Sequence, residues 1–161
     1  MSLSVLFLIL SCVHVRDVRG YPSGAPQSEC VAMTPRGPHG ASQTTTSPYQ
    51  ITTDALPNGY VPGETYTGRQ EQKFLYKHGA FSISKTLPSD SDFRGFLCQV
   101  RQVGRTTAVG TFSVRNTLKA RTLDCSNEND AVTHTNDLLT SQQLFDWTAP
   151  SIGVGTQLEI M

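Results

Sequence analysis

The chain consists of short stretches in which apolar and polar residues alternate, separated by residues that favour turns. In FSISKTL, for example, Phe81 and Ile83 fall on one side of an extended backbone. Alternation of this kind predicts half-buried β-strands, and no window shows the 3.6-residue apolar repeat of a helix. Turn signals such as Pro57-Asn58-Gly59 and Pro62-Gly63 recur at intervals typical of an all-β sandwich. Strands are predicted at Tyr49–Thr53, Phe81–Leu87, Gly95–Arg101, Ala108–Val114, Arg121–Cys125, Ala131–His134 and Leu144–Thr148.

The strand around Cys98 predicts part of the core. Alternation places Phe96, Cys98 and Val100 on one face of this strand, and Leu97, Gln99 and Arg101 on the other. Cys98 shares its face with two apolar residues, which favours the role of a small buried hydrophobe over that of a disulfide partner. A thiol in such surroundings has a raised pKa and reacts slowly.

The first twenty residues predict a secretory signal peptide. Met1 to Gly20 contains an apolar segment from Leu3 to about Val15, and Val18 and Gly20 occupy the small-residue positions before a cleavage site. The apolar segment is shorter than the roughly 20 residues of a spanning helix. We therefore expect an exported chain that begins at Tyr21 and has no transmembrane segment.

The net charge narrows the candidate partners, and the cysteine count limits the disulfide pairing. Removal of Arg16, Arg19 and Asp17 from 13 basic and 13 acidic residues leaves 11 and 12, a formal net charge of −1. Without a basic run, nucleic acid and anionic membrane surfaces are poor candidate partners. Three cysteines remain beyond the signal, so at most one internal pair can form and one thiol is left over.

Residues 21–48 predict an irregular arm laid over a single domain. This stretch is dense in Pro, Gly, Ser and Thr, which prevents a helix from running through it. Its cysteine, Cys30, is placed where it could tie the arm down. The rest of the chain shows no internal repeat, no low-complexity tract and no second domain.

Several separated motifs occur in a characteristic order along the mature chain. They are YPSGAP from Tyr21, Cys30-x-x-Met33-x-Pro35, His39-Gly40, SPYQI from Ser47, YVPGETY from Tyr60, FRGFLCQVR from Phe93, VGTFSV from Val109, Leu123-x-Cys125, AVTHTN from Ala131 and Trp147-Thr-Ala-Pro150. Together they resemble the reeler domain, most closely the form found in ferric-chelate-reductase-like membrane proteins and in secreted insect defence proteins. The resemblance covers essentially the whole of residues 21–161.

The resemblance implies an immunoglobulin- or fibronectin-like β-sandwich with an irregular, disulfide-tethered N-terminal arm. It further implies that Cys30 pairs with Cys125. The relatives commonly carry an apolar residue at the position of Cys98, so this cysteine is expected in the structural core, together with Phe96, Val100, Phe112 and Trp147. No cofactor is expected.

Two stretches depart from the family pattern. Residues 68–82 look like an insertion, because relatives usually have one short continuous strand there. The relatives also continue beyond Trp-Thr-Ala-Pro into a long final strand, whereas here the chain reads SIGVGTQLEIM. We therefore expect a truncated C-terminal strand, with a stub at 157–160.

Residues able to carry chemistry are present, but they do not form a known catalytic or metal-binding motif. His39 and His134 lack further ligands at zinc spacing, and no Gly-x-Ser-x-Gly elbow occurs. Asp90-Ser-Asp92 is only a fragment of a calcium loop. Trp147 suits a core position better than a sugar-stacking surface. We predict no catalytic residue, no cofactor-binding residue and no metal site.

These observations predict a secreted, non-enzymatic recognition or adhesion module. Its partner would be an extracellular protein, a glycan or a microbial surface. One alternative is the extracellular domain, as a fragment or isoform, of a ferric-chelate-reductase-like membrane protein. Another is an innate-immune factor that binds microbes.

Overall fold

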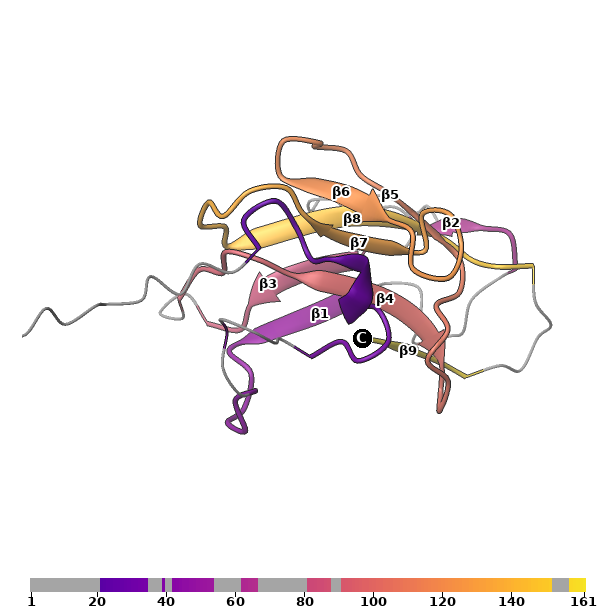
Figure 1. Ribbon diagram of the computed structural model, residues 1–161, viewed down its shortest axis with the longest axis horizontal. Coiled ribbons are helices and arrows are strands. Elements are labelled where there is room, and N and C mark those ends of the chain that lie inside the picture. The colour runs from indigo at the N-terminus through magenta and orange to yellow at the C-terminus, as the bar shows by residue number, and fades with distance from the viewer. Residues whose placement is uncertain are drawn as a thin grey trace, which may run out of the picture.

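The fold consists of two antiparallel β-sheets and almost no helix among the described residues, as the alternation pattern predicted (Figure 1). The computed structural model describes residues 21–34, 39, 42–53, 62–66, 81–87, 91–151 and 157–161. The predicted signal peptide, residues 68–80 of the suspected insertion and the turn at residues 57–59 lie outside these ranges.

Among the described residues, the first sheet has five strands. Strands β1 (Tyr49–Thr53), β3 (Phe81–Lys85), β8 (Gln142–Thr148) and β2 (Thr65–Tyr66) follow one another in that order, and β5 (Thr111–Ser113) also pairs with β8. The seven-residue β8 is central, because it contacts β3 through its first half and β2 and β5 through its second half. Phe81 and Ser82, the last two residues of the suspected insertion, belong to β3 and pair with both β1 and β8.

The second sheet, in the part of the chain that the structure describes, has four strands in the order β6 (Ala120–Leu123), β7 (Ala131–His134), β4 (Leu97–Gln102) and β9 (Leu158–Ile160). Strand β9 lies within the expected C-terminal stub and pairs with β4 at Val100–Gln102. The sequence pattern located most of the strands to within a few residues, and β1 and β7 have the predicted bounds. It did not identify β2, because two residues are too few to show an alternation.

The core lies between the two sheets and is rich in aromatic residues. Trp147 and Phe145 project from β8, Phe81 from β3 and Phe112 from β5, and each is at most 3% exposed. The rings of Phe81 and Trp147 meet edge to face at 5.6 Å. Trp147 donates its indole N–H to the carbonyl of Val109 over 3.1 Å, so its one polar atom is satisfied inside the core. The second sheet covers these rings with small and aliphatic side chains: Cys98, Val100, Ala120 and Val132.

The outer face of the second sheet is covered by the arm (Figure 1, where the indigo segment passes in front of β4 and β7). Gln99 and Arg101, on the face of β4 opposite Cys98, are therefore buried as well, at 1% and 3% exposure. Strand β4 is thus buried on both faces. Its alternation shows which residues share a face, but it does not show that both faces are covered.

Candidate functional site

The predicted core and disulfide residues occupy the following positions. Cys30 and Cys125 form a disulfide with a Cα–Cα distance of 5.6 Å, which joins the arm to the end of β6. Cys98 is a free, fully buried thiol, and burial raises its pKa from 9.0 to about 12. Val100, Phe112 and Trp147 are buried; Phe96 is half-buried and packs against the core. These side chains serve packing, and the raised pKa of Cys98 makes it a poor nucleophile.

Arg101 anchors the arm beside the disulfide. Its guanidinium donates to the carbonyl oxygens of Cys30 and Val31, and its Nε donates to Oε1 of Gln99 over 2.8 Å. Burial lowers the pKa of Arg101, and the nearby Glu159 carboxylate partly offsets this effect. Since its hydrogen bonds hold backbone carbonyls, the buried cation has a structural role and is not directed at a ligand.

The beginning of the arm is held by β7 and β6. Thr133 accepts the backbone N–H of Ala25 over 2.9 Å, and Arg121 donates to the carbonyl of Ser23 over 3.2 Å. His134 places Nε2 2.8 Å from the carbonyl of Tyr21, while its Nδ1 accepts the backbone N–H of Phe96 over 3.1 Å. Both ring nitrogens of His134 are thus engaged by backbone groups.

Two acidic residues close to the disulfide also have structural partners. Asp130 is fully buried and its carboxylate accepts the backbone N–H groups of Cys125, Ser126 and Asn127 over 2.7–2.8 Å. Asp124 accepts the N–H of Asn129. The part of the chain that the structure describes contains no group of three or more His, Cys, Asp or Glu side chains arranged to hold a metal ion.

Three loop segments meet at one end of the sandwich, and we call this region the loop end. It comprises residues 93–96, 116–119 and 135–141. Phe93 and Thr140 exchange two backbone hydrogen bonds, Arg94 donates to the carbonyl of Asp137 over 2.9 Å, and Asn136 donates to the carbonyl of Leu118. These contacts join segments that are far apart in sequence.

The loop end carries large apolar side chains in exposed positions. Leu118, Leu138 and Leu139 are 79%, 67% and 55% exposed. Single exposed leucines are ordinary on a protein surface, but a group of them gathered on linked loops is typical of an interaction site.

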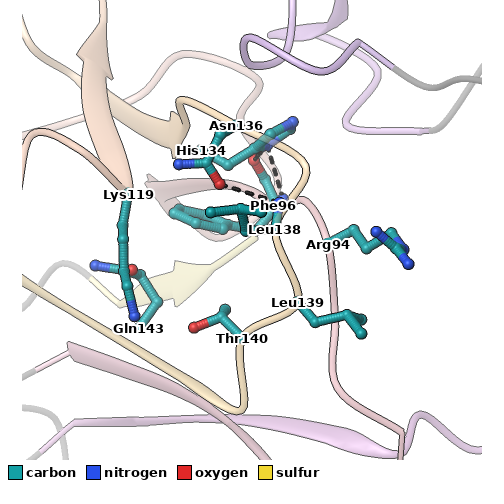
Figure 2. A pocket seen from close by; sticks show the side chains of 9 residues that line it. All are labelled: Arg94, Phe96, Lys119, His134, Asn136, Leu138, Leu139, Thr140 and Gln143. Carbon is teal, nitrogen blue, oxygen red and sulfur yellow. Dashed lines mark hydrogen bonds between the residues drawn. The ribbon is translucent and has the colours of Figure 1, made fainter.

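A hollow opens at this end of the sandwich (Figure 2). Its lining residues are Arg94, Phe96, Lys119, His134, Asn136, Leu138, Leu139, Thr140 and Gln143. The empty volume of about 280 Å³ includes space open to solvent, so the enclosed part of the hollow is far smaller than a typical small-molecule site. Figure 2 shows Lys119 and Gln143 at one side of the hollow, and Arg94 and Leu139 at the other. No sequence pattern connects these residues, because they come from three loops and from the ends of β7 and β8.

The geometry defines a class of protein: an antiparallel β-sandwich with a disulfide-tethered arm and a hollowed, leucine-bearing loop end. A family model described as the reeler domain matches residues 28–160, and the chain belongs to this family. The prediction of a reeler domain is therefore confirmed.

Two relatives and one solved structure illustrate the similarity. The chain is 32% identical over 154 residues to "Defense protein l(2)34Fc" of Drosophila melanogaster, and the match covers 91% of this chain and 79% of that protein. It is 32% identical over 153 residues to "Putative ferric-chelate reductase 1" of Danio rerio, covering 92% of this chain but 22% of that protein. The Reelin-N domain of F-spondin superposes with a TM-score of 0.54 at 21% identity, covering 83% of this chain and 80% of the other. At that identity, the likeness to F-spondin shows the fold alone.

Within the described residues, no helix is long and apolar enough to cross a membrane.

Proposed function

We propose that this chain is a secreted, non-enzymatic recognition or adhesion module that contacts its partner through the loop end. The observation that carries the proposal is a set of leucines on the linked loops, Leu118, Leu138 and Leu139, each more than half exposed. Leu138 and Leu139 also line the hollow, together with hydrogen-bonding side chains. Loops on a rigid β-sandwich are a common place for binding residues, because the scaffold fixes their positions while their sequences vary freely.

The surroundings of the cysteine thiol, the histidine ring and the buried carboxylate support a role without catalysis. Cys98 is protonated and buried, both nitrogens of His134 face backbone groups, and Asp130 is saturated by backbone donors. A general base or nucleophile needs a free lone pair within reach of a substrate. These three groups do not offer one.

A microbe-binding, innate-immune role is the first specific version of this proposal. It is favoured by the relative described as a defence protein, most of whose length is matched by this chain. In this version, the loop end would contact a component of a bacterial or fungal surface.

In the second version of the proposal, the chain is an extracellular part of a ferric-chelate-reductase-like membrane protein. It is favoured by the Danio rerio relative, of which the matched region is about one fifth. Any reductase chemistry would then belong to other parts of such a protein. A full-length transcript that encodes membrane-spanning segments would support this version, and one that lacks them would refute it.

The experiment that tests the contact surface compares two double variants. Leu138→Ser/Leu139→Ser removes apolar side chains that are 67% and 55% exposed, and Val31→Ser/Val103→Ser removes side chains that are 65% and 55% exposed away from the hollow. Binding of the labelled chain to bacterial, fungal and animal cells is measured by flow cytometry against an unrelated β-sandwich domain. We expect the leucine pair to reduce binding at least tenfold and the valine pair to leave it within twofold.

Two results would contradict the proposal. Equal loss in both double variants would show that the loop end is not the contact surface. Retention on bacterial and fungal cells no higher than that of the unrelated domain would exclude the microbe-binding version.

A further inference from the structure

The segment between the arm and β1 is a run of exposed hydroxyl side chains. It reads Ser42-Gln-Thr-Thr-Thr-Ser47 and is followed by Pro48. Residues 42–47 are all exposed and belong to no helix or strand. In Figure 1 the segment is part of the purple coil that leads into β1 and lies outside both sheets. Because its backbone is not held in a sheet, an enzyme that acts on an extended chain has access to it.

The three threonines of this segment are available to react. Ser47 uses its hydroxyl locally: its Oγ donates to the carbonyl of Tyr49 over 3.0 Å and accepts the N–H of the same residue over 3.1 Å. The hydroxyls of Thr44, Thr45 and Thr46 make no comparable bond with a described residue. A group attached to them would therefore break no contact of the described fold.

The composition around the threonines is typical of sites that carry O-linked sugars. Stretches rich in Ser and Thr that also contain proline are characteristic of O-glycosylated segments of exported proteins. No Asp, Glu, Lys or Arg lies between Arg36 and Asp54, and Pro48 favours an extended backbone at the residue before it. The chain contains no Asn-x-Ser/Thr sequence, so the usual acceptor of N-linked sugars is absent.

The position of the segment gives a bound sugar a physical use. The carbonyl of Pro48 accepts the N–H of Thr86 over 2.8 Å, which fixes the point where the segment meets the first sheet. Among the described strands, β1 pairs only with β3, so its other edge has no described partner. A bulky, hydrated group beside such an edge hinders its pairing with strands of other chains.

We propose that one or more of Thr44, Thr45 and Thr46 carry an O-linked N-acetylhexosamine. The threonine Oγ1 forms a bond to C1 of the sugar, while the bond between C1 and the diphosphate of a nucleotide sugar breaks. The hydroxyl proton passes to a base of the transferase, and the nucleoside diphosphate is the leaving group. The inference rests on the export of the chain in the proposed function, because such transferases act on proteins in the secretory pathway.

The test is a mass measurement on secreted protein. The full chain, with its own N-terminal residues, is expressed in cultured animal cells and recovered from the medium. Intact mass spectrometry detects the modification, and electron-transfer fragmentation locates it. We expect at least one N-acetylhexosamine increment within residues 42–47 of the wild type, and its complete loss in Thr44→Ala/Thr45→Ala/Thr46→Ala.

A second variant serves as the matched control. Thr106 and Thr107 are also exposed, in the connection between β4 and β5, but they follow Arg105 and have no proline beside them. We expect Thr106→Ala/Thr107→Ala to keep the full increment of the wild type. Because every substituted side chain is exposed, both variants should fold.

Four outcomes would refute the inference: unmodified wild type in the medium, a phosphate increment in place of the sugar, a sugar located outside residues 42–47, or a sugar that persists in the variant of Thr44, Thr45 and Thr46. None of these bears on cell binding through Leu138 and Leu139. Absence of the chain from the medium would count against export in the proposed function and against the modification together.

Discussion

Removal of the disulfide is the change whose effect can be worked out most directly from the structure. The variant Cys30→Ala/Cys125→Ala removes a link between residues 95 positions apart. In the chain-entropy model, closing a loop of this length lowers the entropy of the unfolded chain by an amount equivalent to about 4–5 kcal/mol of stability. This is a large fraction of the roughly 5–15 kcal/mol by which domains are stable.

The folded state should change little in this variant. The arm remains attached through Arg101 at the carbonyls of Cys30 and Val31, through Thr133 at Ala25, and through His134 at Tyr21. The loss of stability therefore acts mainly through a more expanded unfolded chain. We expect the denaturant dependence of the unfolding free energy, the m-value, to increase along with the fall in stability.

Urea unfolding followed by tryptophan fluorescence measures both quantities. Trp147 is the only tryptophan of the chain and is fully buried in the core, so its emission reports global unfolding. The matched control is Cys98→Ala, which removes a buried sulfur without removing a cross-link and should cost only about 1 kcal/mol. A double variant that is no less stable than this control would refute the chain-entropy reasoning. So would a large loss of stability with an unchanged m-value.

Three further predictions follow from individual residues. Gly110→Ala should destabilise the fold by at least about 2 kcal/mol more than Gly104→Ala in urea unfolding, an estimate from the cost of overpacking. Both glycines have positive φ, but a Cβ at residue 110 would lie 2.5 Å from the carbonyl oxygen of Thr148 and against Trp147, whereas a Cβ at residue 104 meets nothing within 4 Å. Equal losses of stability in the two variants would contradict this prediction. Burial raises the pKa of Cys98 from 9.0 to about 12, so the folded state disfavours the thiolate, and stability is lost as the pH rises from 9 towards 12, by up to about 4 kcal/mol. The advantage of wild type over Cys98→Ala, about 1 kcal/mol below pH 9, should therefore vanish and change sign over this range, and a flat difference would count against it. Alkylation of the denatured, unreduced mature chain should label Cys98 alone, and mass spectrometry that finds the label on another cysteine would overturn the pairing.

Local sequence was sufficient for most of the strands and for the burial of Cys98. The period-two alternation around Cys98, and the β-branched and aromatic residues of β1 and β7, specify extended backbone with one apolar face. Those features act between near neighbours, so they can be read without knowledge of the rest of the molecule. The pairing of Cys30 with Cys125 did not come from local pattern; it was expected only from the resemblance to the family.

Only the tertiary structure decided what covers each face and where the loops meet. Arg101 was assigned to the face opposite Cys98, yet its burial depends on the arm, 70 residues earlier in the chain. The hollow depends on Arg94, Lys119 and Gln143, which no spacing rule connects. An alternation pattern records the preference of each residue for one side of a strand, whereas the placement of distant segments depends on sheet pairing and on which surfaces they bury together.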